Sequence, residues 1–392
     1  RAEAGAVSAL AAYVPLTFAW GEAFQFDWSE EHLVIGGIWR KVQLAHMKLC
    51  ASRAFWLVAY PGQGHEMLFD AHTRCLAGLG GVARRGIYDN MKTAVDQTPR
   101  KDRGRVVNAR FAAMTAHYLF DADFCNVASG WEKGRVEKGV QDARRRIWLD
   151  AGQERFGSFA ELNAWLATQV REAWSAPHPD GPGMSIREAW EHEQPHLMPM
   201  PTPFDGYVEL PARVSSTSLV AVARNRYSVP CHFAGHRVSV RLYPEKVVIV
   251  AEQNVVAEHP RAVDRDHVIY DWQHYLPLIE RKPGALRNGA PFADLPDSLQ
   301  RLRRALLKRD GGDKVMAQVL MAVPIHGLEA VLVAVDLVLD SGRPSAEHVL
   351  NVLARLREGP PPPSVETALQ VSAAPLADPE RYDSLRTEVS HG

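Results

Sequence analysis

The chain is poor in cysteine, has almost no excess of charge of either sign and contains no long apolar run. Its four cysteines, Cys50, Cys75, Cys125 and Cys231, lie far apart, which excludes a zinc-binding spacing and a disulfide framework and favours a reducing cytosol. Because the formal net charge is −1, a uniformly basic nucleic-acid-binding protein is excluded, and any basic surface must be local. The lack of a run of about 18 apolar residues argues against a membrane span, so we expect a cytoplasmic protein with no membrane partner.

The 392 residues suffice for two to three domains. Residues 23–28 alternate like a strand, and a continuous apolar run at 55–60 fits a strand buried on both faces. Helices and strands then alternate, which predicts an α/β domain with a mixed sheet, whereas short strands at close spacing predict a small all-β barrel. The expected segments are 1–20 (N-terminal connector), 21–150 (α/β core), 151–205 (helical connector and linker), 206–262 (β-barrel), 263–358 (C-terminal helical region) and 359–392 (disordered tail).

Three acidic residues stand at positions suited to metal binding. Asp27 lies between two aromatic residues of an apolar strand, where a lone carboxylate is costly to bury unless it is paired or binds a metal ion. Asp89 ends a short strand, and Glu137 borders the apolar stripe of a helix expected at about 132–149. Mg²⁺ prefers carboxylate ligands. In phosphoryl transfer, two such ions about 4 Å apart can activate the attacking oxygen and stabilise the leaving oxygen.

Each acid also has an ordinary structural explanation. Asp89 precedes Asn90 and fits a turn, and Glu137 fits a surface ion pair on a helix rich in Lys and Arg. Glu132 competes with Glu137 for the metal site, but it lies about 140° further round the helix, so the two cannot point into one site. The spacing of the acids therefore does not by itself establish a catalytic centre.

The segments around the three acids resemble the acid-bearing motifs of insertion-sequence transposases of the IstA type. They are 24–30 (FQFDWSE), 88–95 (YDNMKTAV) and 133–137 (KGRVE), with 61 residues between the aspartates and 47 between Asp89 and Glu137. The resemblance continues at 225–230 (NRYSVP), 274–277 (HYLP) and 280–286 (ERKPGAL). It covers about residues 10–300, and the combination of motifs in this order is specific.

This resemblance implies a catalytic core of the ribonuclease-H-like, retroviral-integrase type, followed by a β-barrel of the kind seen in Mu-type transposases. It implies a DDE mechanism in which Asp27, Asp89 and Glu137 are catalytic and hold two Mg²⁺ ions, with Mn²⁺ as a substitute. Water would attack the phosphodiester at the end of the element, and the 3′-hydroxyl so released would attack target DNA. The implied partners are DNA, further copies of the chain in a homo-oligomer, and an AAA+ ATPase helper, IstB, which we expect to contact the tail or the C-terminal helices.

Family members carry helix-turn-helix DNA-binding segments before the core, and residues 1–20 are too few to hold them. Our leading interpretation is a DNA transposase that carries out both cleavage and strand transfer. One alternative is a nuclease of the same fold that hydrolyses DNA without joining it. The other is an inactive DNA-binding remnant that keeps the barrel and the basic helices.

Basic residues near the acids are candidates for DNA contacts. Six lie between residues 133 and 146, opposed there by only two acids, and a net positive helix beside a metal site suits a phosphate backbone. A solvated charged face is the alternative, and a second basic helix is expected at 301–309. The expected nucleic-acid contacts are Lys92, Lys133, Arg135, Lys138 and Arg144.

Overall fold

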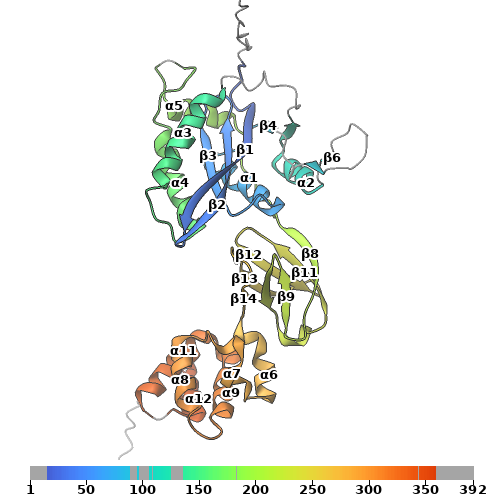
Figure 1. Cartoon of the computed structure of the whole chain (residues 1–392), viewed down its shortest axis with the longest axis vertical. Coiled ribbons are helices and arrows are strands. Elements are labelled where there is room, and N and C mark those ends of the chain that lie inside the picture. The colour runs from blue at the N-terminus through green and yellow to red at the C-terminus, as the bar shows by residue number, and fades with distance from the viewer. Residues whose placement is uncertain are drawn as a thin grey trace, which may run out of the picture. The chain divides into compact units, whose positions relative to one another are not determined.

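The computed structural model describes residues 16–88, 95–96, 106–107, 109–124, 136–181, 183–342 and 344–358. Within these ranges, the side chains of residues 95–96, 106–107, 136–143 and 357–358 are not described. The chain divides into two compact units, Arg1–Tyr275 and Leu276–Gly392 (Figure 1). The first unit contains a five-stranded sheet flanked by helices, together with smaller sheets, and the second unit is helical. The expected tail at 359–392 lies outside the described residues.

The five-stranded sheet has the order β3-β2-β1-β4-β7. β1 (Ala23–Ile35) pairs antiparallel with β2 (Ile38–Leu49), which pairs antiparallel with β3 (Phe55–Tyr60). β4 (Arg85–Tyr88) runs parallel to β1, and β7 (Asp121–Phe124) runs parallel to β4. All six residues of β3 are buried, in agreement with its continuous apolar run. The predicted ribonuclease-H-like core with a mixed five-stranded sheet is therefore confirmed.

Helices lie on both faces of this sheet (Figure 1). α1 and α2 cover one face, and α3, α4 and α5 lie on the other side. α1 ends where Gly80 adopts a φ of 85°, a left-handed conformation that costs glycine little. With both faces covered, the ends of the strands are the natural place for a site. The helices are α1 (His65–Leu79), α2 (Ala109–Tyr118), α3 (Val136–Ala151), α4 (Phe159–Ala173) and α5 (Ile186–Glu193).

Side chains of α4 and of the residue that follows it cover the outer edge of β3. The Ala59 N–H donates to Asn163 Oδ1 at 2.6 Å, and Asn163 Nδ2 donates to the Ala59 carbonyl at 3.0 Å. Trp174 Nε1 donates to the Phe55 carbonyl at 3.1 Å. An uncovered edge strand presents unpaired N–H and C=O groups. Here an amide and an indole take the place of a neighbouring strand.

Two further sheets of the first unit form the small all-β region that the sequence predicts. Their orders are β14-β10-β9 and β13-β12-β11-β8, and they share an apolar core that includes Val220, Tyr227, Val240 and Ile249. β5 (Val95–Asp96) and β6 (Val106–Val107) make a separate two-stranded pair. The strands of the all-β region are β8 (Val208–Arg213), β9 (Leu219–Val222), β10 (Asn225–Ser228), β11 (Arg237–Leu242), β12 (Lys246–Ala251), β13 (Asn254–Pro260) and β14 (Val268–Ile269).

The second unit is built from helices, in agreement with the predicted C-terminal helical region. Leu299, Leu302 and Leu306 bury one face of α8, at the three- and four-residue spacing of an amphipathic helix. Among the described helices of the whole chain, none is both long enough and apolar enough to cross a membrane. The helices are α6 (Leu276–Arg281), α7 (Ala285–Asn288), α8 (Asp297–Leu306), α9 (Gly312–Met321), α10 (Val323–His326), α11 (Leu328–Asp340) and α12 (Ala346–Glu358).

Candidate active site

Asp27 lies in β1, the central strand of the sheet, directly opposite His46 of β2. Its side chain is exposed, and Oδ1 accepts a hydrogen bond of 2.8 Å from the N–H of Trp28. The expectation that Asp27 carries a burial penalty is therefore wrong. The apolar neighbours on β1 face the opposite side of the strand, because side chains alternate. An exposed carboxylate at this position can meet a solvated cation or a phosphate.

The end of β4 lies beside Asp27. Phe26 of β1 is in register with Tyr88, the last residue of β4, and the two strands are parallel. Asp89 is the next residue of the sequence after Tyr88, and it lies outside the described residues. Ligands of open α/β sheets commonly bind outside the carboxyl ends of the strands. The register therefore identifies the part of β1 beside the C-terminal end of β4 as the candidate site.

A buried aromatic cluster supports these two strand ends. The His72 ring of α1 stacks on Phe26 with 4.3 Å between ring centroids, and its Nε2 lies 2.9 Å from the Tyr88 hydroxyl. His72 Nδ1 lies 2.8 Å from the Leu68 carbonyl, which can only accept, so Nδ1 carries the proton and Nε2 accepts from Tyr88. Burial lowers the pKa of His72 to about 4, which keeps the ring neutral. A neutral imidazole thus holds the last residue of β4 in place.

α3 lies over the face of the sheet that carries Asp27. Burial, and then the positive charges of Lys48 and Arg144, lower the pKa of His46 to about 3. The charge of the half-buried Arg144 of α3 therefore acts on the direct partner of Asp27. Of the five expected nucleic-acid contacts, Arg144 is the one whose side chain is among those described.

The structure describes the remaining predicted site residues only in part. Glu137 and Lys138 belong to α3, but their side chains are not described. Among the residues with described side chains, no group of three or more His, Cys, Asp or Glu gathers in a way that could hold a metal ion. The structure therefore describes the side chain of one of the three predicted acids, Asp27, within β1 and beside the end of β4. Asp89, Lys92, Glu132, Lys133 and Arg135 lie outside the described residues.

Two polar residues near Asp27 were not among the predicted site residues. Ser29 follows it by two positions on β1, and His46 faces it from β2, so both belong to the same face of the sheet as Asp27. The signal was present in the sequence, because His46 and Lys48 alternate with apolar residues in β2. What could not be read from the sequence is which residue of β1 they oppose.

The NRYSVP segment has a structural role. Asn225 of β10 donates through Nδ2 to the Asp264 carbonyl at 2.8 Å and accepts from the His267 N–H at 3.0 Å. Ser228 Oγ accepts from the Asp271 N–H at 2.8 Å and lies 2.8 Å from His274 Nδ1. These side chains hold the segment after β13 against the all-β region, and they link the NRYSVP segment to the first residue of HYLP, His274.

The mixed sheet of order β3-β2-β1-β4-β7, with an exposed acid on its central strand beside the end of β4, defines a ribonuclease-H-like core. Residues 199–271 match the family described as Mu transposase, C-terminal domain. A transposase for insertion sequences IS1326/IS1353 from Pseudomonas aeruginosa is 51% identical over 381 residues, which cover 95% of this chain and 75% of that protein. A transposase for insertion sequence element IS21 from Pseudomonas aeruginosa is 32% identical over 244 residues, which cover 60% of each chain.

The chain belongs to the insertion-sequence transposases, and within them it is of the IstA type. Proteins of this family act on DNA. The structure is also similar to the HTLV-2 integrase catalytic core domain, solved in complex with magnesium. That comparison has a TM-score of 0.31 and 11% identity, and covers 43% of this chain and 96% of the other.

Proposed function

We propose that this chain cleaves DNA at the 3′ ends of an insertion sequence and joins them to target DNA, with Asp27, Asp89 and Glu137 as the metal-binding acids. The observation that carries the proposal is the register of β1 and β4. Phe26 and Tyr88 lie side by side on parallel strands, and each is followed in the sequence by an aspartate. Continuing the register by one residue would bring the two carboxylates to the same end of the sheet.

The course of α3 supports Glu137 as the third acid. The N–H of Gly36, just after β1, donates to the Phe156 carbonyl at 2.8 Å, five residues beyond α3. The C-terminal side of α3 is thus tied to the far end of β1, while Arg144 lies near the partner of Asp27. Asp27 to Ile35 spans about 26 Å of strand, and Glu137 to Ala151 spans about 21 Å of helix. Both acids would therefore come to the same end of the sheet.

The described donor suits a hard cation. Asp27 offers exposed carboxylate oxygens, which Mg²⁺ and Mn²⁺ accept as ligands. When bound, the cations would lower the pKa of water and neutralise charge on the phosphate. The residues of this chain would orient the scissile phosphodiester for in-line attack, first by water and then by the freed 3′-hydroxyl. Arg144 would hold the phosphate backbone, and Lys92, Lys133, Arg135 and Lys138 are proposed for the same role.

A strand-transfer assay tests this proposal. The chain is incubated with a labelled element end, a target plasmid and Mg²⁺ or Mn²⁺, and the cut and joined products are separated. Asp27→Asn and Glu137→Gln should abolish both products, whereas Asp121→Asn, an exposed acid at the far end of β7, should retain them. Cutting without joining would favour the hydrolytic nuclease. DNA binding with no metal-dependent product, unchanged by Asp27→Asn, would favour the inactive remnant.

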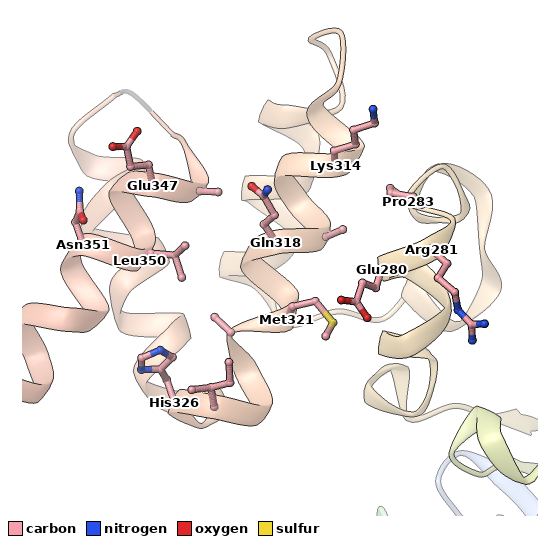
Figure 2. Close-up of a pocket in the computed structure, with 14 residues that line it drawn as sticks. Glu280, Arg281, Pro283, Lys314, Gln318, Met321, His326, Glu347, Leu350 and Asn351 are labelled. Carbon is pink, nitrogen blue, oxygen red and sulfur yellow. The ribbon is translucent and has the colours of Figure 1, made fainter.

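We further propose that the second unit contacts an ATPase helper of the IstB type, and that copies of the chain assemble on DNA in the bacterial cytoplasm. A groove of about 910 Å³ lies between α6, α9 and α12 (Figure 2). Ile325 and Leu350 line it, and they are 70% and 41% exposed. Exposed apolar side chains in a groove suit a helix of a partner protein. Ile325→Asp and Leu350→Asp should weaken capture of the purified helper, whereas Leu356→Asp, on α12 but outside the groove, should not.

A further inference from the structure

Two buried polar atoms beside Asp27 are without hydrogen-bond partners in the described part of the chain. They are the hydroxyl oxygen of Ser29 and Nε2 of His46. Buried polar groups are nearly always paired in folded proteins, because an unmade hydrogen bond inside a protein is costly. Two such atoms next to a candidate catalytic acid therefore require an explanation.

The register of the sheet brings both residues to Asp27. His46 is its direct partner across β1 and β2, and such partners have Cβ atoms about 4.5–5.5 Å apart. Ser29 lies two residues along β1, and side chains at i and i+2 share a face. The His46 ring also packs at a steep angle against Phe55, with 5.7 Å between centroids. The hydroxyl and the imidazole thus share the face of the sheet that carries the carboxylate, one along β1 and the other across from it on β2.

Both groups can serve as donors. A serine hydroxyl donates one hydrogen bond, and a neutral imidazole donates one through whichever nitrogen carries the proton. A carboxylate has about four lone-pair positions, so it can accept several hydrogen bonds, of which the one from the Trp28 N–H is an example, and bind a cation at the same time. The chemistry of the three side chains is complementary.

We propose that Ser29 and His46 are positioning residues that donate hydrogen bonds to the carboxylate of Asp27 and hold it in the orientation that binds the divalent cation. This inference rests on the proposed function, because it takes Asp27 to be a metal ligand. It explains why two buried donors stand unpaired at this place. The Ser29 hydroxyl and the His46 imidazole would be preorganised to donate to Asp27 in the orientation that it adopts with the cation bound. Hydrogen-bond partners of metal-binding carboxylates commonly orient their ligands in this way.

The test measures Mn²⁺ affinity rather than activity. Free Mn²⁺ is followed by electron paramagnetic resonance as the full chain is titrated. Ser29→Ala and His46→Leu should each raise the Kd for Mn²⁺ about 10- to 100-fold. His46→Gln, which keeps an N–H donor, should stay close to the unmodified chain. The matched control is His32→Gln on the same strand, where an exposed ring stacks on Trp39 far from Asp27.

A thermal melt separates positioning from simple packing. Ser29→Ala removes a buried hydroxyl that has no partner in the described structure, so the melting temperature should stay the same or rise. A lower melting temperature together with an unchanged Kd would show that Ser29 serves the fold alone, and would overturn its part of the proposal.

Asp27→Asn distinguishes failure of this inference from failure of the proposed function. If Asp27→Asn weakens Mn²⁺ binding while Ser29→Ala and His46→Leu bind within twofold of the unmodified chain, the positioning role is wrong and the acid assignment stands. If Asp27→Asn itself binds Mn²⁺ unchanged, Asp27 is not a ligand, and both proposals fall.

Discussion

Two ion pairs join the sheet domain to the all-β region, and they should differ sharply in what they contribute to stability. Arg261, just after β13, donates to Glu66 of α1 at 2.9 Å, and the two side chains are 15% and 7% exposed. Arg40 of β2 donates to Asp264 through two hydrogen bonds of 2.5 and 2.8 Å, but Asp264 is 45% exposed. The Arg261–Glu66 pair is therefore largely buried, whereas the Arg40–Asp264 pair has one solvent-exposed partner, Asp264.

Arg261→Met should therefore be far more damaging than Arg40→Met. Removing Arg261 leaves the Glu66 carboxylate buried without its partner, which typically costs about 3–5 kcal/mol. Removing Arg40 leaves Asp264 able to hydrate, and exposed pairs contribute about 1 kcal/mol or less. At about 2–4 °C per kcal/mol for a unit of this size, Arg261→Met should lower the melting temperature by about 6–20 °C. Arg40→Met should lower it by about 4 °C at most.

Scanning calorimetry at pH 7 on the full chain measures both shifts. Adding Glu66→Gln to Arg261→Met should recover part of the loss, because a buried amide is less costly than a buried charge. Equal shifts for the two arginine variants, or a shift of less than about 2 °C for Arg261→Met, would refute the reasoning from burial.

Three further predictions follow from the packing of the sheet. Gly78→Ala in α1 should lower the melting temperature by an amount worth about 1–3 kcal/mol, although Ala usually favours a helix, because its Cβ would come 2.3 Å from the Trp56 ring. Asn163→Leu should cost about 1–3 kcal/mol in urea unfolding, because it leaves the N–H and carbonyl of Ala59 unpaired. The His72 pKa of about 4 lies below its unfolded value of about 6.5, so its contribution to stability is complete above pH 6.5 and is lost as the pH falls toward 4. The free energy of unfolding, measured in urea, should therefore fall by about 3 kcal/mol over that range, and His72→Gln should flatten the fall.

The strands of the sheet could be predicted because their burial leaves a direct trace in the sequence. The run at 55–60 is apolar throughout, and β3 is buried on both faces. The exposure of Asp27 could not be predicted, since it depends on which other segments pack on its face of the sheet. Register and strand length are properties of paired segments, and one segment alone does not reveal them.

The NRYSVP segment shows a second limit of the sequence. Its presence supports the family assignment, and residues 199–271 confirm that region as the Mu-type C-terminal domain. Its role follows only from the hydrogen bonds, in which Asn225 and Ser228 fasten residues 264–274 that lie about 40 positions further along the chain. A polar residue that pairs with distant backbone cannot be told from a polar residue in water by its own neighbours in sequence.

The aromatic residues that precede the two aspartates give the site its location. Phe26 and Tyr88 are both buried in contact with His72, and both stand one residue before an aspartate. Because β1 and β4 are parallel, burying these two rings in one cluster fixes the register of the two strands. The aromatic residue that precedes each aspartate thus contributes to packing, whatever the aspartate does. Hydrophobic burial of the two rings aligns β1 with β4.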